Sequence, residues 1–211
     1  MRIVPVADPP EPGVVEVAAR ALTSGQIVGL PTDTVYGLGA DAFDAVAAGR
    51  LLAAKRRPAL VGVAVLVADE DQAESLAESV PPVARVLMSR FWPGALTIVV
   101  RGRATLPPHV GAGDATIGVR CPAHPVPLAL SRAVGPLATT SANLHGQPTL
   151  TTAAAVAATF GESVPLVLDG GTCVGSPSTV VRCTGEQPEL VREGRIPWIE
   201  VRRALRGGRE G

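Results

Sequence analysis

The stretch Pro31-Thr32-Asp33-Thr34-Val35-Tyr36-Gly37-Leu38-Gly39-Ala40-Asp41-Ala42 decides how the fold of this chain is interpreted. It follows the apolar residues 27–30, whose pattern predicts a strand. In open α/β sheets ligands bind beyond the carboxyl ends of strands, so the threonine hydroxyls and backbone amides here suit an amino acid or a phosphate. A structural alternative is a tight turn in which Gly37 and Gly39 adopt backbone angles that other residues avoid.

Helix-like apolar spacing alternates with short apolar runs on both sides of this stretch. The alternation predicts one α/β domain over residues 1–205, followed by a flexible tail over 206–211. The run over 61–67 is apolar throughout, which is typical of a strand in a sheet covered on both faces. Helices are expected at residues 12–23, 43–54, 70–79, 82–90, 125–133, 152–160 and 197–205. Strands are expected at residues 27–30, 61–67, 95–100, 116–120, 136–140, 165–168, 178–183 and 189–192.

The composition excludes several classes of protein. The 211 residues hold 19 Lys and Arg against 19 Asp and Glu, and 3% are aromatic, which argues against a general binder of polyanions or stacked bases. No stretch approaches the roughly 20 consecutive apolar residues of a membrane span, and the N-terminus lacks a signal-peptide layout, so we expect a cytoplasmic location. The three cysteines are too scattered for a metal motif and are expected to be buried or half-buried thiols.

A cationic segment, Lys55-Arg56-Arg57-Pro58, follows the second expected helix. Three consecutive cations would ordinarily be a solvated helix end that interacts favourably with the helix dipole. Lys55, however, is the single lysine of the chain, and Pro58 forces the backbone to leave the helix. Lys55 and Arg57 could therefore hold a triphosphate from one side and neutralise its charge during phosphoryl or nucleotidyl transfer.

Polar residues adjoin three further predicted strands. Arg120 stands at the end of one strand, where its guanidinium could bind a carboxylate through two parallel hydrogen bonds. Ser141 and Asn143 lie in a small polar loop after the next strand and supply short donors for phosphate oxygens or a ribose. A glycine-rich connection that contains Ser178 precedes another strand. Each segment alone is a weak signal, since Ser and Asn are ordinary turn residues.

Taken together, these segments resemble the YrdC-type threonylcarbamoyl-adenylate synthase family in its single-domain form. They come in the family's order with near-family spacing and span residues 25–196. The matching segments are PTDTVYGLGADA at 31–42, KRRP at 55–58, WPGALTIVV at 92–100, GVRCPAHP at 118–125, TTSAN at 139–143, LDGG at 168–171, STVV at 178–181 and LVREGRI at 190–196. The resemblance implies a twisted, open, mixed α/β sheet flanked by helices, with a broad concave pocket.

The resemblance also implies a reaction. In that family L-threonine condenses with bicarbonate, and the carbamate attacks the α-phosphorus of ATP to give threonylcarbamoyl-adenylate and pyrophosphate, which serves tRNA threonylcarbamoyladenosine modification by a downstream transferase. Mg²⁺ is expected on the ATP phosphates, and no protein side chain is assigned as a metal ligand. The implied threonine-binding residues are Thr34, Arg120, Thr139 and Ser178. The implied nucleotide-binding residues are Lys55, Arg57, Thr116, Ser141, Asn143, Thr149 and Arg192, of which Lys55 and Arg57 would also stabilise charge in catalysis.

One segment departs from the family pattern. Val61 stands where a nucleotide-contacting Asn is common, and Leu66 stands where a threonine-contacting His is common. Two hydrogen bonds of about 0.5–1.5 kcal/mol each would then be missing. By strand alternation Leu66 and Ala64 would face one way, and Val63 and Val65 the other.

Two alternative functions stay open because of this departure. One is a paralogue with the same pocket but altered carbamoyl chemistry or a different amine. The other is a binding module for double-stranded RNA without catalysis, which the net charge of zero and the scarcity of aromatic residues disfavour. Weak direct contact with tRNA or double-stranded RNA also stays open.

Overall fold

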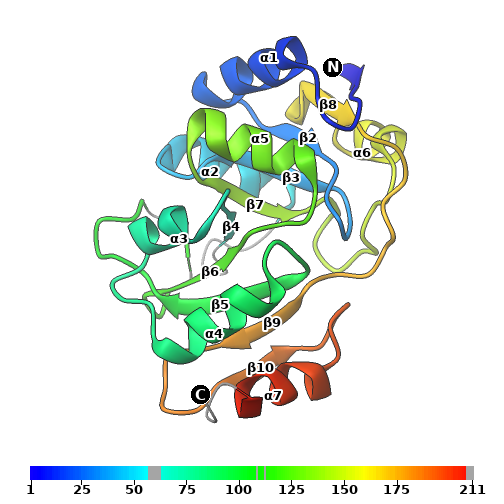
Figure 1. Cartoon of the computed structure of the whole chain (residues 1–211). Helices are drawn as coiled ribbons and strands as arrows, with labels where there is room; N and C mark the ends of the chain where they lie inside the picture. Colours follow the sequence, from blue (N-terminus) through cyan, green and yellow to red (C-terminus); the bar gives the residue numbers. More distant parts are fainter. Residues whose placement is uncertain (57–62, 108, 112, 208–211) are drawn as a thin grey trace.

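Ten strands form one twisted, open, mixed sheet in the computed structural model, which describes residues 1–56, 63–107, 109–111 and 113–207 (Figure 1). Across the sheet their order is β1-β8-β2-β3-β7-β4-β6-β5-β9-β10. Neighbours are parallel in the pairs β1–β8, β8–β2, β4–β6 and β5–β9 and antiparallel in the others. The expected fold class is confirmed. The strands are β1 (Arg2–Pro5), β2 (Val28–Leu30), β3 (Gly37–Asp41), β4 (Ala64–Leu66), β5 (Leu96–Arg101), β6 (Thr116–Arg120), β7 (Leu137–Ser141), β8 (Leu166–Asp169), β9 (Thr179–Arg182) and β10 (Glu189–Arg192).

Helices flank the sheet, and several begin at residues that satisfy free backbone amides. The side-chain oxygens of Asp44, Asp69 and Thr152 accept hydrogen bonds from the first turns of α2, α3 and α6. No helix among the described residues is both long and apolar enough to cross a membrane. The helices are α1 (Pro12–Thr23), α2 (Ala45–Ala54), α3 (Glu70–Leu76), α4 (Pro82–Phe91), α5 (Pro125–Val134), α6 (Ala153–Phe160) and α7 (Trp198–Gly207), with a 3₁₀ turn at Gly161–Ser163.

The two faces of the sheet carry different helices. α1 and α5 pack against each other and share a buried apolar cluster with Leu30, Leu66 and Leu137 on one face. On the other face Val65 and Ile98 belong to a larger cluster, to which helices α2, α3, α4 and α6 contribute. Each fully buried aliphatic side chain of this kind stabilises the fold by about 1.5–3 kcal/mol. The face that carries α1 and α5 continues over β5, β6 and β9, where its side chains line a cavity.

The stretch at 31–42 contains a strand that the sequence pattern did not reveal. β3 pairs with β2 on one side and with β7 on the other. Neither Gly37 nor Gly39 has positive φ, so the tight-turn interpretation is wrong. The glycines instead permit close approach, because a Cβ on Gly39 would lie 2.8 Å from Cδ2 of Leu30 and one on Gly37 would lie 3.2 Å from Cγ2 of Thr139.

Three other expectations need correction. The edge strand β1 was not expected, because its four residues are mostly exposed and show no buried apolar run. The strand expected at 61–67 is the shorter β4, and residues 61–62 lie outside the described chain. The helix α7 continues to Gly207 and so includes the start of the expected tail, whereas residues 208–211 are not described. The remaining expected helices and strands are confirmed, with end shifts of a few residues.

Candidate functional site

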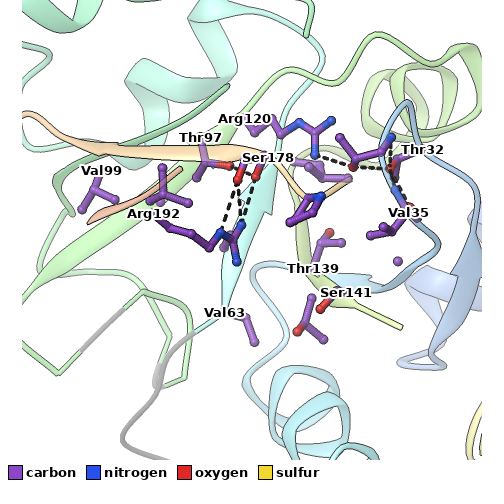
Figure 2. A pocket seen from close by; sticks show the side chains of 18 of the residues that line it. Thr32, Val35, Val63, Thr97, Val99, Arg120, Thr139, Ser141, Ser178 and Arg192 are labelled. Atoms are coloured by element: carbon purple, nitrogen blue, oxygen red, sulfur yellow. Dashed lines mark hydrogen bonds between the residues drawn. The ribbon is translucent and has the colours of Figure 1, made fainter. Parts of the chain in front are cut away.

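A cavity of about 490 Å³ lies on the sheet face described above (Figure 2). Successive side chains of a strand point to opposite faces, so alternate residues of neighbouring strands form the floor of the cavity. Loop residues between β2 and β3 and residues from the end of β7 onward form its sides. The floor residues are Thr97 and Val99 of β5, Thr116, Gly118 and Arg120 of β6, and Val180 and Arg182 of β9 with the preceding Ser178.

Arg120 lies at the buried end of the cavity with 6% of its surface exposed. Its guanidinium donates hydrogen bonds to the carbonyl of Gly94 at 2.9 Å, to Oγ1 of Thr34 at 3.0 Å and to Oδ1 of Asp33 at 2.5 Å. Burial lowers the pKa of Arg120, and the Asp33 carboxylate opposes that shift, so the guanidinium stays charged. Of its five N–H groups, three serve these partners, which leaves two that could reach a ligand carboxylate.

Thr32 fixes the orientation of Thr34 beside Arg120. The Thr32 hydroxyl donates to the carbonyl of Val35 at 2.6 Å and accepts from the backbone amide of Thr34 at 3.1 Å. Because its proton is directed to Val35, the 2.9 Å contact between the two threonine hydroxyls has Thr34 as donor. Both hydroxyls are buried, so Thr34 presents an oriented oxygen to Arg120 and to the cavity.

Arg192 of β10 extends over Ser178 at the β9 side of the cavity (Figure 2). The Arg192 guanidinium donates to the Ser178 carbonyl at 2.9 Å from Nη2 and at 3.3 Å from Nε, and the Ser178 hydroxyl lies 2.9 Å from Oγ1 of Thr97. The segment after Arg192 is held against β9 by Thr179, whose Oγ1 accepts from the amides of Gly194 at 2.9 Å and Ile196 at 3.1 Å. These contacts fix the position of Arg192 over the cavity.

Lys55 reaches the cavity wall from behind. Its ammonium group donates to the carbonyl of Ser141 and, at 2.9 Å, to Oδ1 of Asn143. Both partners line the cavity, whereas Lys55 is 3% exposed at the end of α2. The interpretation of residues 55–58 as a solvated helix end is therefore wrong for Lys55. Arg57 and Val61 lie outside the described residues.

The lining has the charge character of a site for anions. Three arginines, Arg120, Arg182 and Arg192, reach the cavity, together with many hydroxyl groups. Among the described residues that line it there is no carboxylate side chain. Groups of three or more His, Cys, Asp or Glu suited to a metal ion are likewise absent from the described part of the chain.

The structure brings together most of the residues expected from sequence. Apart from Lys55 and the undescribed Arg57, every expected site residue lines the cavity, namely Thr34, Thr116, Arg120, Thr139, Ser141, Asn143, Thr149, Ser178 and Arg192. Sequence reasoning missed Thr32, Thr97 and Arg182. Strand alternation could have found two of them, because residues two positions apart on a strand point to the same face. Thr97 shares the cavity-facing side of β5 with Val99, and Arg182 shares that of β9 with Val180.

Leu66 also lines the cavity, on the same sheet face as Ala64, and Val65 belongs to the core of the other face. The expected orientation of Leu66 is confirmed. Val63, expected to face away, nevertheless lines the cavity, because it precedes β4 and forms an isolated bridge with Val110.

The fold and this cavity define an α/β protein whose open mixed sheet carries a cavity lined by arginines and hydroxyl groups. The chain belongs to the Sua5/YciO/YrdC family, whose model, described as "Telomere recombination", matches residues 20–194.

Relatives of different lengths share this domain. A protein of Mycobacterium tuberculosis (strain CDC 1551 / Oshkosh) is 42% identical over 189 residues, 89% of this chain and 87% of its own length. The threonylcarbamoyl-AMP synthase of Bacillus subtilis (strain 168) is 43% identical over 182 residues, 85% of this chain but 53% of its own length. The crystal structure of Pyrococcus abyssi Sua5 complexed with L-threonine has a TM-score of 0.93 and 37% identity, covering 97% of this chain and 61% of that chain. The chain thus spans little more than half of the two longer relatives.

Proposed function

We propose that this protein is a threonylcarbamoyl-AMP synthase, which makes threonylcarbamoyl-AMP and pyrophosphate from L-threonine, bicarbonate and ATP. The observation that carries the proposal is the buried Arg120 with two N–H groups left over and Thr34 and Ser178 nearby, in a chain similar to a threonine-bound Sua5. A guanidinium fork binds a carboxylate through two parallel hydrogen bonds, and hydroxyls can receive the amine and side chain of an amino acid. Relatives named threonylcarbamoyl-AMP synthase support the same reaction.

The proposed division of the cavity follows its chemistry. Arg120 and its neighbours Thr34, Thr139 and Ser178 would hold threonine, with the carboxylate on Arg120. The nucleotide would occupy the remaining polar wall. Its proposed contacts are Thr116, Ser141, Asn143, Thr149 and Arg192, with Lys55 acting from behind Ser141 and Arg57 as a further phosphate ligand.

Catalysis in this proposal is positioning with charge stabilisation. Threonine carbamate supplies the nucleophile, its oxygen attacks the α-phosphorus, and pyrophosphate leaves, so no side chain need form a covalent bond. Arg192 and Lys55 would stabilise negative charge on the phosphates. Mg²⁺ would neutralise charge on the same phosphates, and it would arrive with ATP, because the described lining offers cations and hydroxyls rather than carboxylates.

The substrates also indicate where the product would go. A threonylcarbamoyl-adenylate is an activated acyl donor, so a transferase acting on tRNA would consume it, and we place both steps in the cytoplasm where ATP and tRNA meet. Weak direct contact of this chain with tRNA or double-stranded RNA is also part of the proposal. RNA binding that falls with salt, without any pyrophosphate release, would favour the binding-module alternative instead.

The reaction is tested by pyrophosphate release with ATP, bicarbonate and threonine, each omitted in turn. We expect release when all three are present and none when threonine or bicarbonate is missing. Arg120→Lys keeps the charge but loses the fork, so it should weaken threonine binding about tenfold or more and leave ATP binding nearly unchanged. Arg85→Lys, in an exposed pair with Glu74, is the matched control. Unchanged threonine affinity in Arg120→Lys would make Arg120 a structural partner of Asp33, and turnover with another amine in place of threonine would identify a paralogue.

A further inference from the structure

Arg195 connects two segments that line the cavity from different parts of the sheet. It follows β10 and is not among the described residues of the cavity lining. Its Nη1 donates a hydrogen bond to the backbone carbonyl of Asp33 at 2.8 Å, across 162 positions of the sequence. Its backbone amide donates to the carbonyl of Pro177 at 2.9 Å. Arg195 therefore holds the loop between β2 and β3 next to the segment that leads into β9.

The two ends of this contact belong to strands that are far apart in the sheet. β3 and β9 have β7, β4, β6 and β5 between them, so no strand pairing joins them directly. The connection from β8 to β9, which runs along one side of the molecule in Figure 1, adds a neighbouring contact. There the amide of Gly175 donates to the carbonyl of Thr34 at 2.8 Å. The loop is thus tied to the β9 side through two consecutive carbonyls, those of Asp33 and Thr34.

The backbone that carries Arg195 is fixed on the β9 side. A Cβ on Gly194 would lie 2.3 Å from the carbonyl oxygen of Pro177 and 2.6 Å from that of Ser178, so the close approach requires glycine. Oγ1 of Thr179 accepts from the amide of Gly194 and donates to the carbonyl of Ile196 at 2.5 Å. The Arg195 side chain therefore extends from a backbone whose position relative to Ser178 is set.

The position of Asp33 in turn controls the Arg120 guanidinium. Arg120 donates to Oδ1 of Asp33 and to Oγ1 of Thr34, so two of its three acceptors among the described residues lie on the loop that Arg195 holds. The ion pair is nearly buried, with 7% of the Arg120 side chain and 13% of the Asp33 side chain exposed. A shift of the loop would move both acceptors together and reorient the N–H groups that remain for a ligand carboxylate.

Arg195 also contributes charge at this end of the cavity. Burial lowers the pKa of Arg120, Asp33 opposes that shift, and the positive charges of Arg192 and Arg195 lower the pKa further. Both guanidinium groups are therefore near enough to act on Arg120 electrostatically. A charge effect at an exposed residue is screened by salt, whereas a hydrogen bond that positions a loop is not, so the two effects can be separated.

We propose that Arg195 is a positioning residue for threonine binding. Its hydrogen bond to the Asp33 carbonyl holds the loop at residues 32–34 so that Arg120 and Thr34 stay oriented toward the amino acid. The inference rests on the proposed function, because it takes threonine to bind with its carboxylate on Arg120. It places control of threonine affinity in a residue outside the described cavity lining.

The test is the dissociation constant of threonine, measured by calorimetry for the unmodified protein, Arg195→Gln and Arg195→Lys. The titrations are made at about 0.5 M salt, where the Debye length is only a few ångströms. We expect Arg195→Gln to bind threonine about fivefold more weakly, the equivalent of one lost hydrogen bond. Arg195→Lys can still donate one bond to the Asp33 carbonyl and should regain part of this loss. Arg85→Gln, which removes an arginine from an exposed pair, is the matched control and should keep the affinity of the unmodified protein.

A double-mutant cycle shows whether Arg195 acts through Arg120. In an Arg120→Lys background the carboxylate fork is already lost, so Arg195→Gln should weaken threonine binding little further. In the pyrophosphate assay Arg195→Gln should raise the KM for threonine about fivefold and leave kcat within about twofold. Loss of folded protein would instead lower kcat and leave KM unchanged. Thermal unfolding verifies that the variants are folded, as expected for an exposed side chain.

Failure of this inference and failure of the proposed function give different results. If the unmodified protein binds threonine and Arg195→Gln binds it equally well, this inference alone is overturned. An equal loss in the Arg120→Lys background would show that Arg195 acts independently of Arg120. A loss seen only at low salt, or Arg195→Lys that binds no better than Arg195→Gln, would contradict the role of the hydrogen bond. An unmodified protein that binds no threonine overturns the proposed function as well.

Discussion

At the level of single residues, Lys55 shows how burial changes the meaning of a charged side chain. The sequence pattern singled out Lys55, but it could not show that the ammonium group lies beneath Ser141 and Asn143. Whether a helix end is solvated depends on what packs over it, and here the covering loop comes from a strand some 86 positions further along the chain. The residues around Lys55 in the sequence therefore could not predict that contact.

Replacement of Lys55 should therefore affect stability as well as activity. Lys55→Met keeps much of the volume but leaves the Ser141 carbonyl and Asn143 amide oxygen without this donor. We expect the free energy of unfolding to fall by about 1–3 kcal/mol and pyrophosphate release to fall by orders of magnitude. Chemical denaturation and the release assay measure the two effects. Near-normal release in Lys55→Met would show that the proposed stabilisation of phosphate charge by Lys55 is wrong.

Leu66 raises the question of how the cavity recognises a threonine side chain. It is paired with Arg120 across β4 and β6, so it lies next to the proposed carboxylate site. Its 5% exposure and its contacts in the α1–α5 cluster make that part of the wall apolar. An apolar wall cannot pair a hydroxyl, and sites that do so owe much of their selectivity to that pairing.

We predict that Leu66→His will raise the preference for threonine over valine in adenylate formation by about tenfold. The unmodified protein should accept both amino acids, since both offer a carboxylate to Arg120. Leu66→Met, which stays apolar, is the matched control and should not change the ratio. A strong threonine preference in the unmodified protein that Leu66→His leaves untouched would assign the discrimination to hydroxyls such as Thr34 or Ser178.

At the level of elements, regular amphipathic segments were predicted well and short strands rich in glycine were not. α1 and β6 have the ends expected from the sequence. β3 was missed because Gly37 and Gly39 are poor strand formers, and one of its two partners, β7, lies about a hundred residues away. Pairing with strands on both sides, rather than local propensity, makes it a strand.

The start of α5 provides a pH-dependent prediction. His124 is the N-cap residue, and its Nδ1 accepts from the amide of Val126 at 3.2 Å, which requires the neutral imidazole. Burial lowers the pKa of His124, and the nearby carboxylates of Asp33 and Asp8 oppose the shift without cancelling it. The unfolded chain, with an ordinary pKa of about 6.5, therefore takes up this proton first as the pH falls. The contribution of His124 to the free energy of unfolding is therefore complete above about pH 6.5. It declines as the pH falls further, until the pH is below the lowered pKa that His124 has in the folded protein.

His124→Asn should flatten this part of the pH profile, because asparagine caps a helix without titrating. The free energy of unfolding, measured by denaturant titration between about pH 7 and pH 5, should fall less steeply in this variant than in the unmodified protein. His145→Asn, at an exposed position, serves as the control and should keep the slope of the unmodified protein. Equal slopes in His124→Asn and the unmodified protein would assign the pH dependence to other groups.

At the level of the whole molecule, the cavity is built from segments spread along most of the chain. Thr32 and Arg192 stand near opposite ends of the sequence, yet both line it. The terminal strands β1 and β10 are the two edges of the sheet (Figure 1). The cavity is lined by interior strands and, at one edge, by Val191 and Arg192 of β10. A ligand in the cavity would therefore contact strands from the middle of the sheet to its β10 edge. The resemblance of ordered motifs predicted this convergence, whereas hydrophobic periodicity alone would not have done so.

Substrates should accordingly stabilise the protein as one unit. A ligand at a hundred times its dissociation constant adds about 2.7 kcal/mol to the free energy of unfolding, which corresponds to about 5–10 °C in melting temperature for a domain of this size. We expect a single calorimetric transition that moves upward with ATP and again with threonine. Arg120→Lys should lose the threonine shift and keep the ATP shift, because only the carboxylate fork is removed. Two transitions, of which ligands move one, would show instead that the halves of the sheet on either side of the cavity unfold independently.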